Sequence, residues 1–264
     1  MTFQCKKLIA AMVIVGVAVC GQSPADEVAE QGRAILKQYK DSVITVELVL
    51  KQMFSFPGSP SQEMESKVES TGTVISADGL TVVSLSEVDP SSVMEAMTAG
   101  NPQMNGLKMD TEVQDVKMLM SDGTEVPAEV ILRDRELDMA FIRPLKKAET
   151  AFSHVNLEDQ GTPLQLDQVI SVNKLGKVAR RAHSISVERI DAIVVKPRTF
   201  YIPGNDPSNT GLGSPAFTLD GKFIGVFFIR AIKATGGGGQ DNVAVILLPA
   251  IDIQDAADQA PPFE

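Results

Sequence analysis

Short runs of apolar residues separated by turn signals dominate the chain from about residue 42 onward. Ser42 to Leu50 is rich in β-branched residues and partly alternates between apolar and polar positions, as expected of a strand. Asp-Gly pairs at 78–79, 122–123 and 220–221 indicate hairpin turns at three of the joints. Because crossover helices are missing between the runs, the pattern predicts an all-β sandwich or barrel pair, not a parallel α/β sheet. The other predicted strands are Gly72–Ser76, Leu80–Val83, Val116–Met120, Val130–Leu132, Met139–Arg143, Val169–Val172, Ala192–Val195, Phe223–Ile229 and Val243–Leu248.

Helical periodicity is confined to the two ends of this region. Residues 26–41 are predicted as an N-terminal helix, with Glu27 and Glu30 placed favourably in its first turn. Residues 250–264 predict one short helix and a proline-containing tail, too short for an appended PDZ domain. Three stretches are predicted to be irregular: the Met-rich segment 89–115, the segment 197–214, and a glycine-rich hairpin tip at 236–239.

The first 25 residues have the pattern of a secretory leader. Lys6 and Lys7 precede an uncharged run of twelve residues, Leu8–Val19, whereas about 20 are needed to span a bilayer. Small residues then lead to a predicted cleavage site before Asp26. We therefore expect a signal peptide at residues 1–25, no transmembrane span, and a periplasmic or extracellular location. A lipid anchor at Cys20 ranks second, because the preceding valine suits that motif poorly.

Composition restricts the chemistry further. The 264 residues are 44% hydrophobic and 22% charged, which is typical of a globular protein, and the net charge of −10 disfavours nucleic-acid binding. Both cysteines lie in the predicted leader, so we expect neither a disulfide nor a thiol nucleophile in the exported chain. The sequence contains no metal-binding or phosphate-binding motif, and we expect no metal and no cofactor.

Three segments in order resemble the trypsin-like serine proteases of the HtrA/DegP type. They are Ser70–Val83, Val116–Ala128 continuing to Asp138–Ile142, and Gly211–Val226. The resemblance extends from about Ser42 to Pro249. It implies two packed antiparallel β-barrels, roughly at 42–150 and 160–250 of a domain spanning 42–264, with the active site in the cleft between them.

The resemblance also implies where a catalytic triad would stand. Ser86 occupies the histidine position, Asp138 the aspartate position and Leu212 the nucleophile position. A serine hydroxyl does not titrate near neutral pH and cannot act as the general base, and a leucine side chain cannot attack a carbonyl. The oxyanion turn would consist of Thr210, Gly211 and Gly213, with a threonine where the family has glycine. No triad is therefore intact, and we expect Asp138 to have a local structural role.

A shifted alignment offers an alternative nucleophile. Ser214 would then be followed directly by Pro215, which has no N–H to contribute to an oxyanion hole. The histidine would still be missing, because neither His154 nor His183 follows the Leu80–Val83 strand. We expect both histidines to be structural.

The leading hypothesis is therefore an exported trypsin-like pseudoprotease that binds a protein or an extended peptide. The family's substrate-pairing strand maps to Phe227, Phe228, Ile229 and Arg230, although core packing explains the two phenylalanines equally well. Two alternatives remain: an active serine endopeptidase with a displaced triad, and a structural envelope protein whose cleft has collapsed. A basic group on one predicted hairpin is expected to be solvated and not to bind an anionic partner; it comprises Lys174, Lys177, Arg180 and Arg181.

Overall fold

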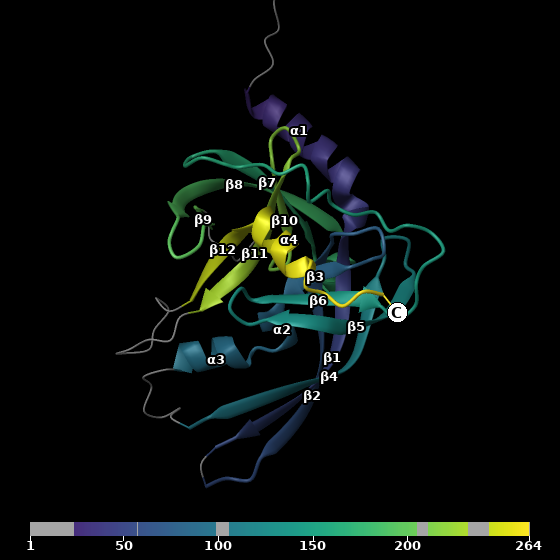
Figure 1. Cartoon of the computed structure of the whole chain (residues 1–264), viewed down its shortest axis with the longest axis vertical. Coiled ribbons are helices and arrows are strands. Elements are labelled where there is room, and N and C mark those ends of the chain that lie inside the picture. Colours follow the sequence, from purple (N-terminus) through teal and green to yellow (C-terminus); the bar gives the residue numbers. More distant parts are fainter. Residues whose placement is uncertain (1–23, 57, 99–105, 205–210, 232–242, 264) are drawn as a thin grey trace, which may run out of the picture.

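The computed structural model of the chain describes residues 24–56, 58–98, 106–204, 211–231 and 243–263. Within these residues the strands close into two six-stranded barrels, which lie one above the other in Figure 1. The strand order is β1-β2-β3-β6-β5-β4 in barrel 1 and β10-β11-β12-β9-β8-β7 in barrel 2. The prediction of two packed antiparallel β-barrels with short terminal helices is confirmed.

Each barrel encloses side chains from its own strands. Barrel 1 is filled by residues such as Val46, Met118 and Ile142, and barrel 2 by residues such as Ile190, Phe227 and Leu247. The strands of barrel 1 are β1 (Val43–Ser55), β2 (Gln62–Val74), β3 (Thr81–Ser84), β4 (Lys108–Leu119), β5 (Glu125–Asp134) and β6 (Met139–Pro144). Those of barrel 2 are β7 (Gln168–Lys174), β8 (His183–Val194), β9 (Phe200–Pro203), β10 (Pro215–Thr218), β11 (Phe223–Ala231) and β12 (Val243–Pro249).

Three strands of barrel 1 extend well beyond the barrel itself. β1 pairs with β2 from Val43 to Phe54 and with β4 from Thr45 to Ser55, and the outer halves of the three strands form an arm at the bottom of Figure 1. The apolar pattern predicted neither the start of β2 at Gln62 nor that of β4 at Lys108. The outer part of β2 is mostly exposed, so no run of apolar residues marks it as a strand.

The segment predicted to be irregular before β4 contains helical structure. The helix α3 (Ser91–Thr98) lies within it, and a shorter helix, α2 (Leu85–Val88), lies just before it and follows β3 directly. The Asp89 carboxylate accepts a hydrogen bond from the Ser91 N–H at 3.2 Å and so helps to start α3. The sequence analysis did not predict α3, because the proline and glycine residues around it are typical of segments where helices end. The second stretch predicted to be irregular contains β9, and the predicted glycine-rich tip lies outside the described residues.

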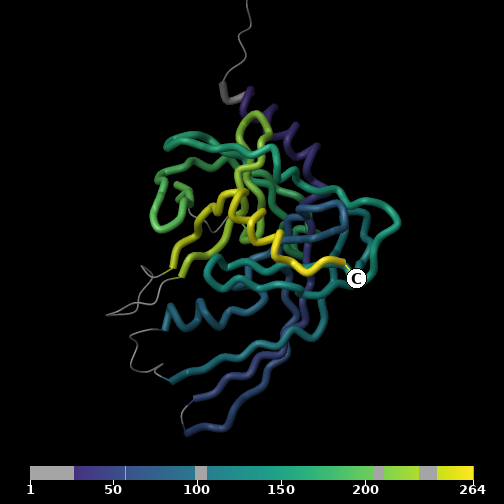
Figure 2. Tube along the Cα trace, in the orientation of Figure 1, coloured from purple at the N-terminus to yellow at the C-terminus, as the bar shows by residue number. Residues whose placement is uncertain are grey.

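The two terminal helices pack on the barrels. α1 (Pro24–Tyr39) is followed by a 3-10 turn (Lys40–Ser42) and lies against barrel 2, where the Tyr39 ring stacks on Phe217 at 4.3 Å between centroids. α4 (Ala250–Ala257) follows β12, and the tail after it returns to barrel 1, as the trace in Figure 2 shows. There Arg143 donates a hydrogen bond to the Pro261 carbonyl.

The predicted leader falls almost entirely outside the described residues, which begin with α1 at Pro24. Cys20 lies outside them as well. Among the helices that are described, none combines the length and the apolar character needed to cross a membrane.

Candidate functional site

Asp138 lies buried where the two barrels meet, with 6% of its surface exposed. Its Oδ1 accepts a hydrogen bond from the Ser86 N–H at 2.7 Å. Its Oδ2 accepts bonds from the Ser84 hydroxyl at 2.5 Å, the Ile229 N–H at 3.0 Å and the Ser86 hydroxyl at 3.3 Å. Burial raises the pKa of Asp138, although the hydrogen bonds from Ser84, Ile229 and Ser86 oppose the shift. The carboxylate is thus surrounded by donors from its own chain.

The position of Asp138 depends on an unusual backbone conformation. Its φ of +57° is left-handed, a region that aspartate tolerates better than most residues do. The Asp138 carbonyl also accepts a hydrogen bond from the Leu85 N–H at 2.8 Å, which holds the start of α2 beside it. Because Ile229 belongs to barrel 2 and the other partners to barrel 1, Asp138 joins the two barrels.

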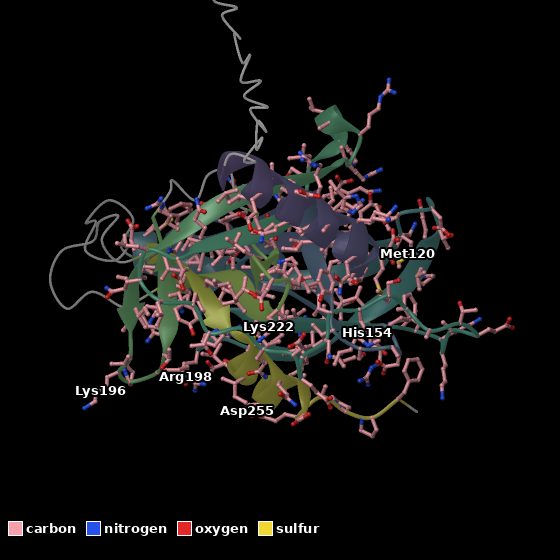
Figure 3. All side chains as sticks on the ribbon, turned by 90° about the horizontal axis from the view of Figure 1, so that it is seen from above. Met120, His154, Lys196, Arg198, Lys222 and Asp255 are labelled. Carbon is pink, nitrogen blue, oxygen red and sulfur yellow. The ribbon has the colours of Figure 1, made fainter. Side chains whose placement is uncertain are left out.

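The structure brings Ser86 next to Asp138, and no imidazole lies between them. Ser86 is buried at the second position of α2, and its hydroxyl lies 2.7 Å from that of Ser84. The two histidines of the chain bond elsewhere. His154 lies at the surface, where it contacts the Phe152 carbonyl (Figure 3), and His183 bonds to the Val43 carbonyl at 3.2 Å. Burial and the charge of Lys174 lower the pKa of His183.

Leu212 lies in a tight turn that is pressed against barrel 1. The next residue, Gly213, has a φ of +78°, and a Cβ there would stand 2.0 Å from the Thr71 carbonyl oxygen. The Thr73 hydroxyl donates to the Gly213 carbonyl at 2.7 Å. Only glycine fits this position. Leu212 itself is half-buried, and Thr210 lies outside the described residues.

Ser214, the alternative nucleophile, is fully buried. Its hydroxyl donates to the Asn173 side-chain oxygen at 2.9 Å, and the Thr71 hydroxyl donates to the same oxygen at 2.9 Å. Asn173 belongs to barrel 2 and Thr71 to barrel 1. The Ser214 hydroxyl therefore takes part in a second polar connection between the barrels.

A second carboxyl group, that of Glu87, is half-buried close to Asp138. Glu87 follows Ser86 in α2, and its carboxyl group accepts a hydrogen bond from the Ser70 hydroxyl. Burial raises the pKa of Glu87 to about 7; the hydrogen bond from Ser70 opposes this shift and the negative charge of Asp138 adds to it.

The basic hairpin between β7 and β8 contacts barrel 1. Arg181 pairs with Glu69 at 2.5 Å, and Lys177 pairs with the same carboxylate at 3.3 Å. Burial favours a higher pKa for Glu69, but the hydrogen bonds from Arg181 and Lys177 lower it overall. Two members of the basic group expected to be solvated are therefore engaged in ion pairs within the chain.

The predicted docking strand divides into a buried and an accessible half. Phe227 and Phe228 are fully buried, and the Phe227 N–H and C=O bond to the Ser214 carbonyl and the Gly213 N–H. Ile229 and Arg230 are half-buried, and Ala231 is exposed. The Arg230 guanidinium lies 5.2 Å from the centroid of the Phe200 ring.

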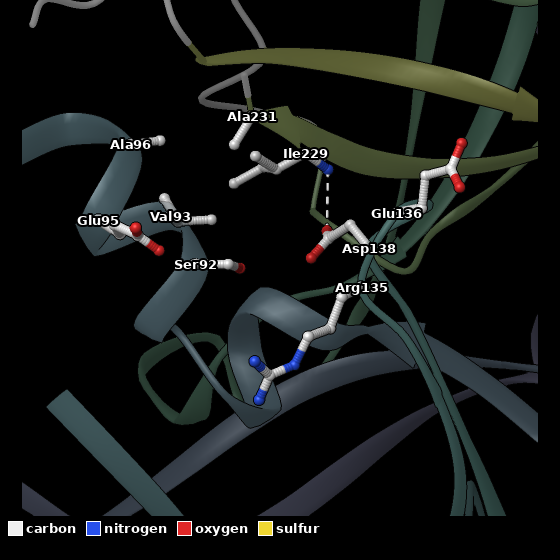
Figure 4. A pocket seen from close by; sticks show the side chains of 9 residues that line it. All are labelled: Ser92, Val93, Glu95, Ala96, Arg135, Glu136, Asp138, Ile229 and Ala231. Atoms are coloured by element: carbon white, nitrogen blue, oxygen red, sulfur yellow. Dashed lines mark hydrogen bonds between the residues drawn. The ribbon is translucent and has the colours of Figure 1, made fainter. Parts of the chain in front are cut away.

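A cavity of about 240 Å³ opens beside the accessible half of the strand (Figure 4). Its walls come from α3, from Arg135, Glu136 and Asp138 in the loop before β6, and from Ile229 and Ala231 of β11. Among the described residues, no group of three or more histidine, cysteine, aspartate or glutamate side chains could hold a metal ion.

Comparisons with known proteins agree with the fold. The sequence model of the trypsin-like peptidase domain matches residues 70–226. The chain belongs to the trypsin-like peptidase family. A similar solved structure is the protease domain of MamO from Magnetospirillum magneticum in its apo form, with a TM-score of 0.51 and 15% identity over 83% of this chain and 96% of that one. That likeness shows the fold alone. No curated protein matches the sequence.

As a trypsin-like peptidase domain, the chain has several site residues that sequence reasoning did not single out. They are Ser84, which bonds to Asp138, Ser70 and Glu87, which bond to each other, and Asn173. Ile229 was singled out as part of a docking strand, but not as a partner of Asp138. Ser84 and Glu87 flank the histidine position, so the polar run after an apolar strand was a usable signal. The Asp138–Ile229 and Thr71–Asn173 contacts join residues 91 and 102 positions apart, and no local pattern indicates them.

Replacing Asp138 with alanine should destabilise this trypsin-like domain by about 3 kcal/mol or more, because it leaves buried donors of Ser84, Ser86 and Ile229 without an acceptor. Asp138→Asn should cost less, since its amide oxygen can still accept. Urea denaturation measures both, and the exposed Asp110→Ala serves as the control. An Asp138→Ala variant as stable as the wild type would contradict the structural role.

Because of the Glu87 carboxyl group, we expect the free energy of unfolding to fall as the pH rises. Its pKa of about 7 in the folded state lies above the ordinary value of 4.5, so the folded chain binds this proton more tightly than the unfolded chain. Below pH 4.5 this group makes its full contribution to the free energy of unfolding. That contribution, up to about 3 kcal/mol, is lost as the pH rises through 7. Urea denaturation between about pH 5 and 8 tests this.

Glu87→Gln should flatten that dependence, whereas the exposed Glu149→Gln should leave it unchanged. An equally steep slope in Glu87→Gln would show that other groups cause it.

Proposed function

We propose that the protein is an exported pseudoprotease that has no peptidase activity and binds an extended peptide along the open edge of β11. The observation that carries the proposal is the set of donors around Asp138. In an active triad, the carboxylate orients the imidazole that takes the proton from the nucleophile. Here Ser86 and Ser84 hydroxyls hold the carboxylate, and Leu212 occupies the nucleophile position. Proton transfer and attack both lack a suitable group.

The buried state of Ser214 argues against a displaced triad. Its hydroxyl donates to an amide oxygen, which is not a base at neutral pH, and Pro215 follows it with no N–H for an oxyanion. The alternative of an active serine endopeptidase therefore receives no support from the surroundings of Ser214.

Peptide binding is supported by the edge of β11 beyond the turn. The Ile229 N–H points away from β12 and toward Asp138, and the strand period of two directs the Ala231 N–H to the same side. Because Asp138 already accepts from the Ile229 N–H, a peptide added to this edge bonds to the Ala231 N–H and the Ile229 carbonyl. The cavity beside it favours a binding role over a collapsed scaffold.

Export is proposed from the sequence of residues 1–25, whose short basic start and twelve-residue apolar run suit a secretory leader. We therefore assign the proposed binding role to the cell envelope.

The absence of peptidase activity can be measured with a fluorophosphonate probe, which labels activated serines. Purified protein should remain unlabelled and should leave casein intact, with trypsin as the positive control. Labelling that disappears in Ser214→Ala would instead establish the displaced-triad enzyme.

Peptide binding at β11 predicts an effect of Ala231→Pro. This substitution removes one N–H from the open edge, where proline is tolerated, and should weaken binding at least tenfold in fluorescence anisotropy. The probe is the casein fragment that binds best on an array of overlapping peptides. Ala231→Gly, which retains the N–H, should bind normally.

If the Ala231→Pro protein does not fold, N-methylated versions of the same peptide test the same hydrogen bonds, because each of them removes one N–H from the peptide instead of from the protein. Unchanged binding by every N-methylated peptide, or the lack of any array peptide that binds, would overturn the proposed binding mode.

A further inference from the structure

The chain is held much less firmly after α4 than within it. The helix packs on β11 and β12, its Ile253 side chain is fully buried, and Asp252 pairs with Arg198 at 2.5 Å. Residues 261–263, by contrast, have no regular secondary structure, and Figure 2 shows this tail crossing from barrel 2 to barrel 1. The helix is thus a firm anchor from which the tail extends over barrel 1.

One side chain of barrel 1 holds the tail. Arg143, near the end of β6, donates a hydrogen bond to the Pro261 carbonyl. Its guanidinium carbon lies 5.6 Å from the centroid of the Phe263 ring, within the range of a cation–π interaction. Pro261 and Pro262 are exposed, and prolines have no N–H to donate. Within the described part of the chain, the hydrogen bond from Arg143 is the only one that residues 261–263 make.

The surroundings of Arg143 are incomplete without the tail. The residue is 9% exposed, and the Asp78 carboxylate lies 3.5 Å from its Nε. That nitrogen is buried and makes no hydrogen bond with any described residue. A cation removed from water needs acceptors around it, and the Pro261 carbonyl and the Phe263 ring supply what the barrel alone does not. Arg143 therefore forms a binding site whose occupant belongs to the same chain.

The occupant has little conformational freedom to lose when it docks. A residue that precedes proline is restricted to extended conformations, so Pro262 limits the course of the chain at Pro261. Proline-rich segments are common ligands of protein surfaces for this reason, because they dock as preformed extended chains. The groups that Arg143 contacts are a carbonyl oxygen of such a chain and an aromatic ring two residues later.

We propose that Arg143 and Asp78 form a docking site for a protein segment with the sequence proline-proline-aromatic, and that the tail occupies this site as a displaceable internal ligand. Because the tail is attached to α4, its effective concentration at the site is on the order of millimolar, and a free segment must compete with it. Arg143 lies five residues after Asp138, about 16 Å along β6 at 3.3 Å per residue, so the site is separate from the edge of β11.

The test measures how a fluorescein-labelled peptide with the sequence of residues 258–263 binds to the whole chain, by fluorescence anisotropy. The Phe263→Ala protein should bind this peptide about tenfold more tightly than the wild type, because its weakened tail competes less. A peptide in which alanine replaces the phenylalanine should bind about tenfold more weakly to both proteins.

Matched variants locate the binding at Arg143. In the Phe263→Ala protein, Arg143→Gln should weaken binding of the peptide about tenfold or more, whereas Arg133→Gln, an exposed substitution on β5, should leave it unchanged. If the Arg143→Gln protein does not fold, Arg143→Lys takes its place. It keeps the charge but not the planar guanidinium, and it should also weaken binding.

The outcomes separate this inference from peptide binding at β11. Equal binding by the wild-type and Phe263→Ala proteins, or no binding by either, would overturn the docking site. Binding that persists in the Arg143 variants but is lost in Ala231→Pro would overturn it as well, because the peptide would then lie at the edge of β11.

Discussion

A carboxylate removed from water needs donors around it, and this requirement organises the centre of the molecule. Asp138 obtains them from Ser84, Ser86 and the Ile229 main chain. Two of these donors belong to barrel 1 and one to barrel 2, so the contacts that stabilise the charge also fix how the barrels meet. Asp138 therefore connects the two barrels.

Other buried polar groups between the barrels also have hydrogen-bond partners on the opposite barrel. Asn173 accepts from Thr71 and Ser214, and Thr73 donates to the turn that contains Leu212. The ion pairs of Glu69 add charge interactions nearer the surface. The turn that contains Leu212 is thus tied to barrel 1 by hydrogen bonds.

Local sequence patterns indicated the architecture but not its junctions. Alternating apolar residues and Asp-Gly turns were sufficient to predict an all-β sandwich or barrel pair, because strand formation and hairpins depend on neighbouring residues. The choice of two packed β-barrels came from the resemblance. Ser86, Asp138 and Leu212 could be assigned to triad positions only through resemblance. The partnership of Asp138 with Ile229 could not be predicted, because it joins residues 91 positions apart. Similarly, α3 could not be predicted, because it is short and packs against β11 and β12, which are distant in sequence.

The central claim is that the Asp138 carboxylate is held by main-chain and hydroxyl donors across the barrel interface. Amide hydrogen exchange at Ile229, followed by NMR, tests this most directly, because that N–H points away from β12 and Asp138 is its acceptor. We predict exchange as slow as that of amides inside the β11–β12 ladder, and rapid exchange in Asp138→Ala. Rapid exchange at Ile229 in the wild-type protein would contradict the account.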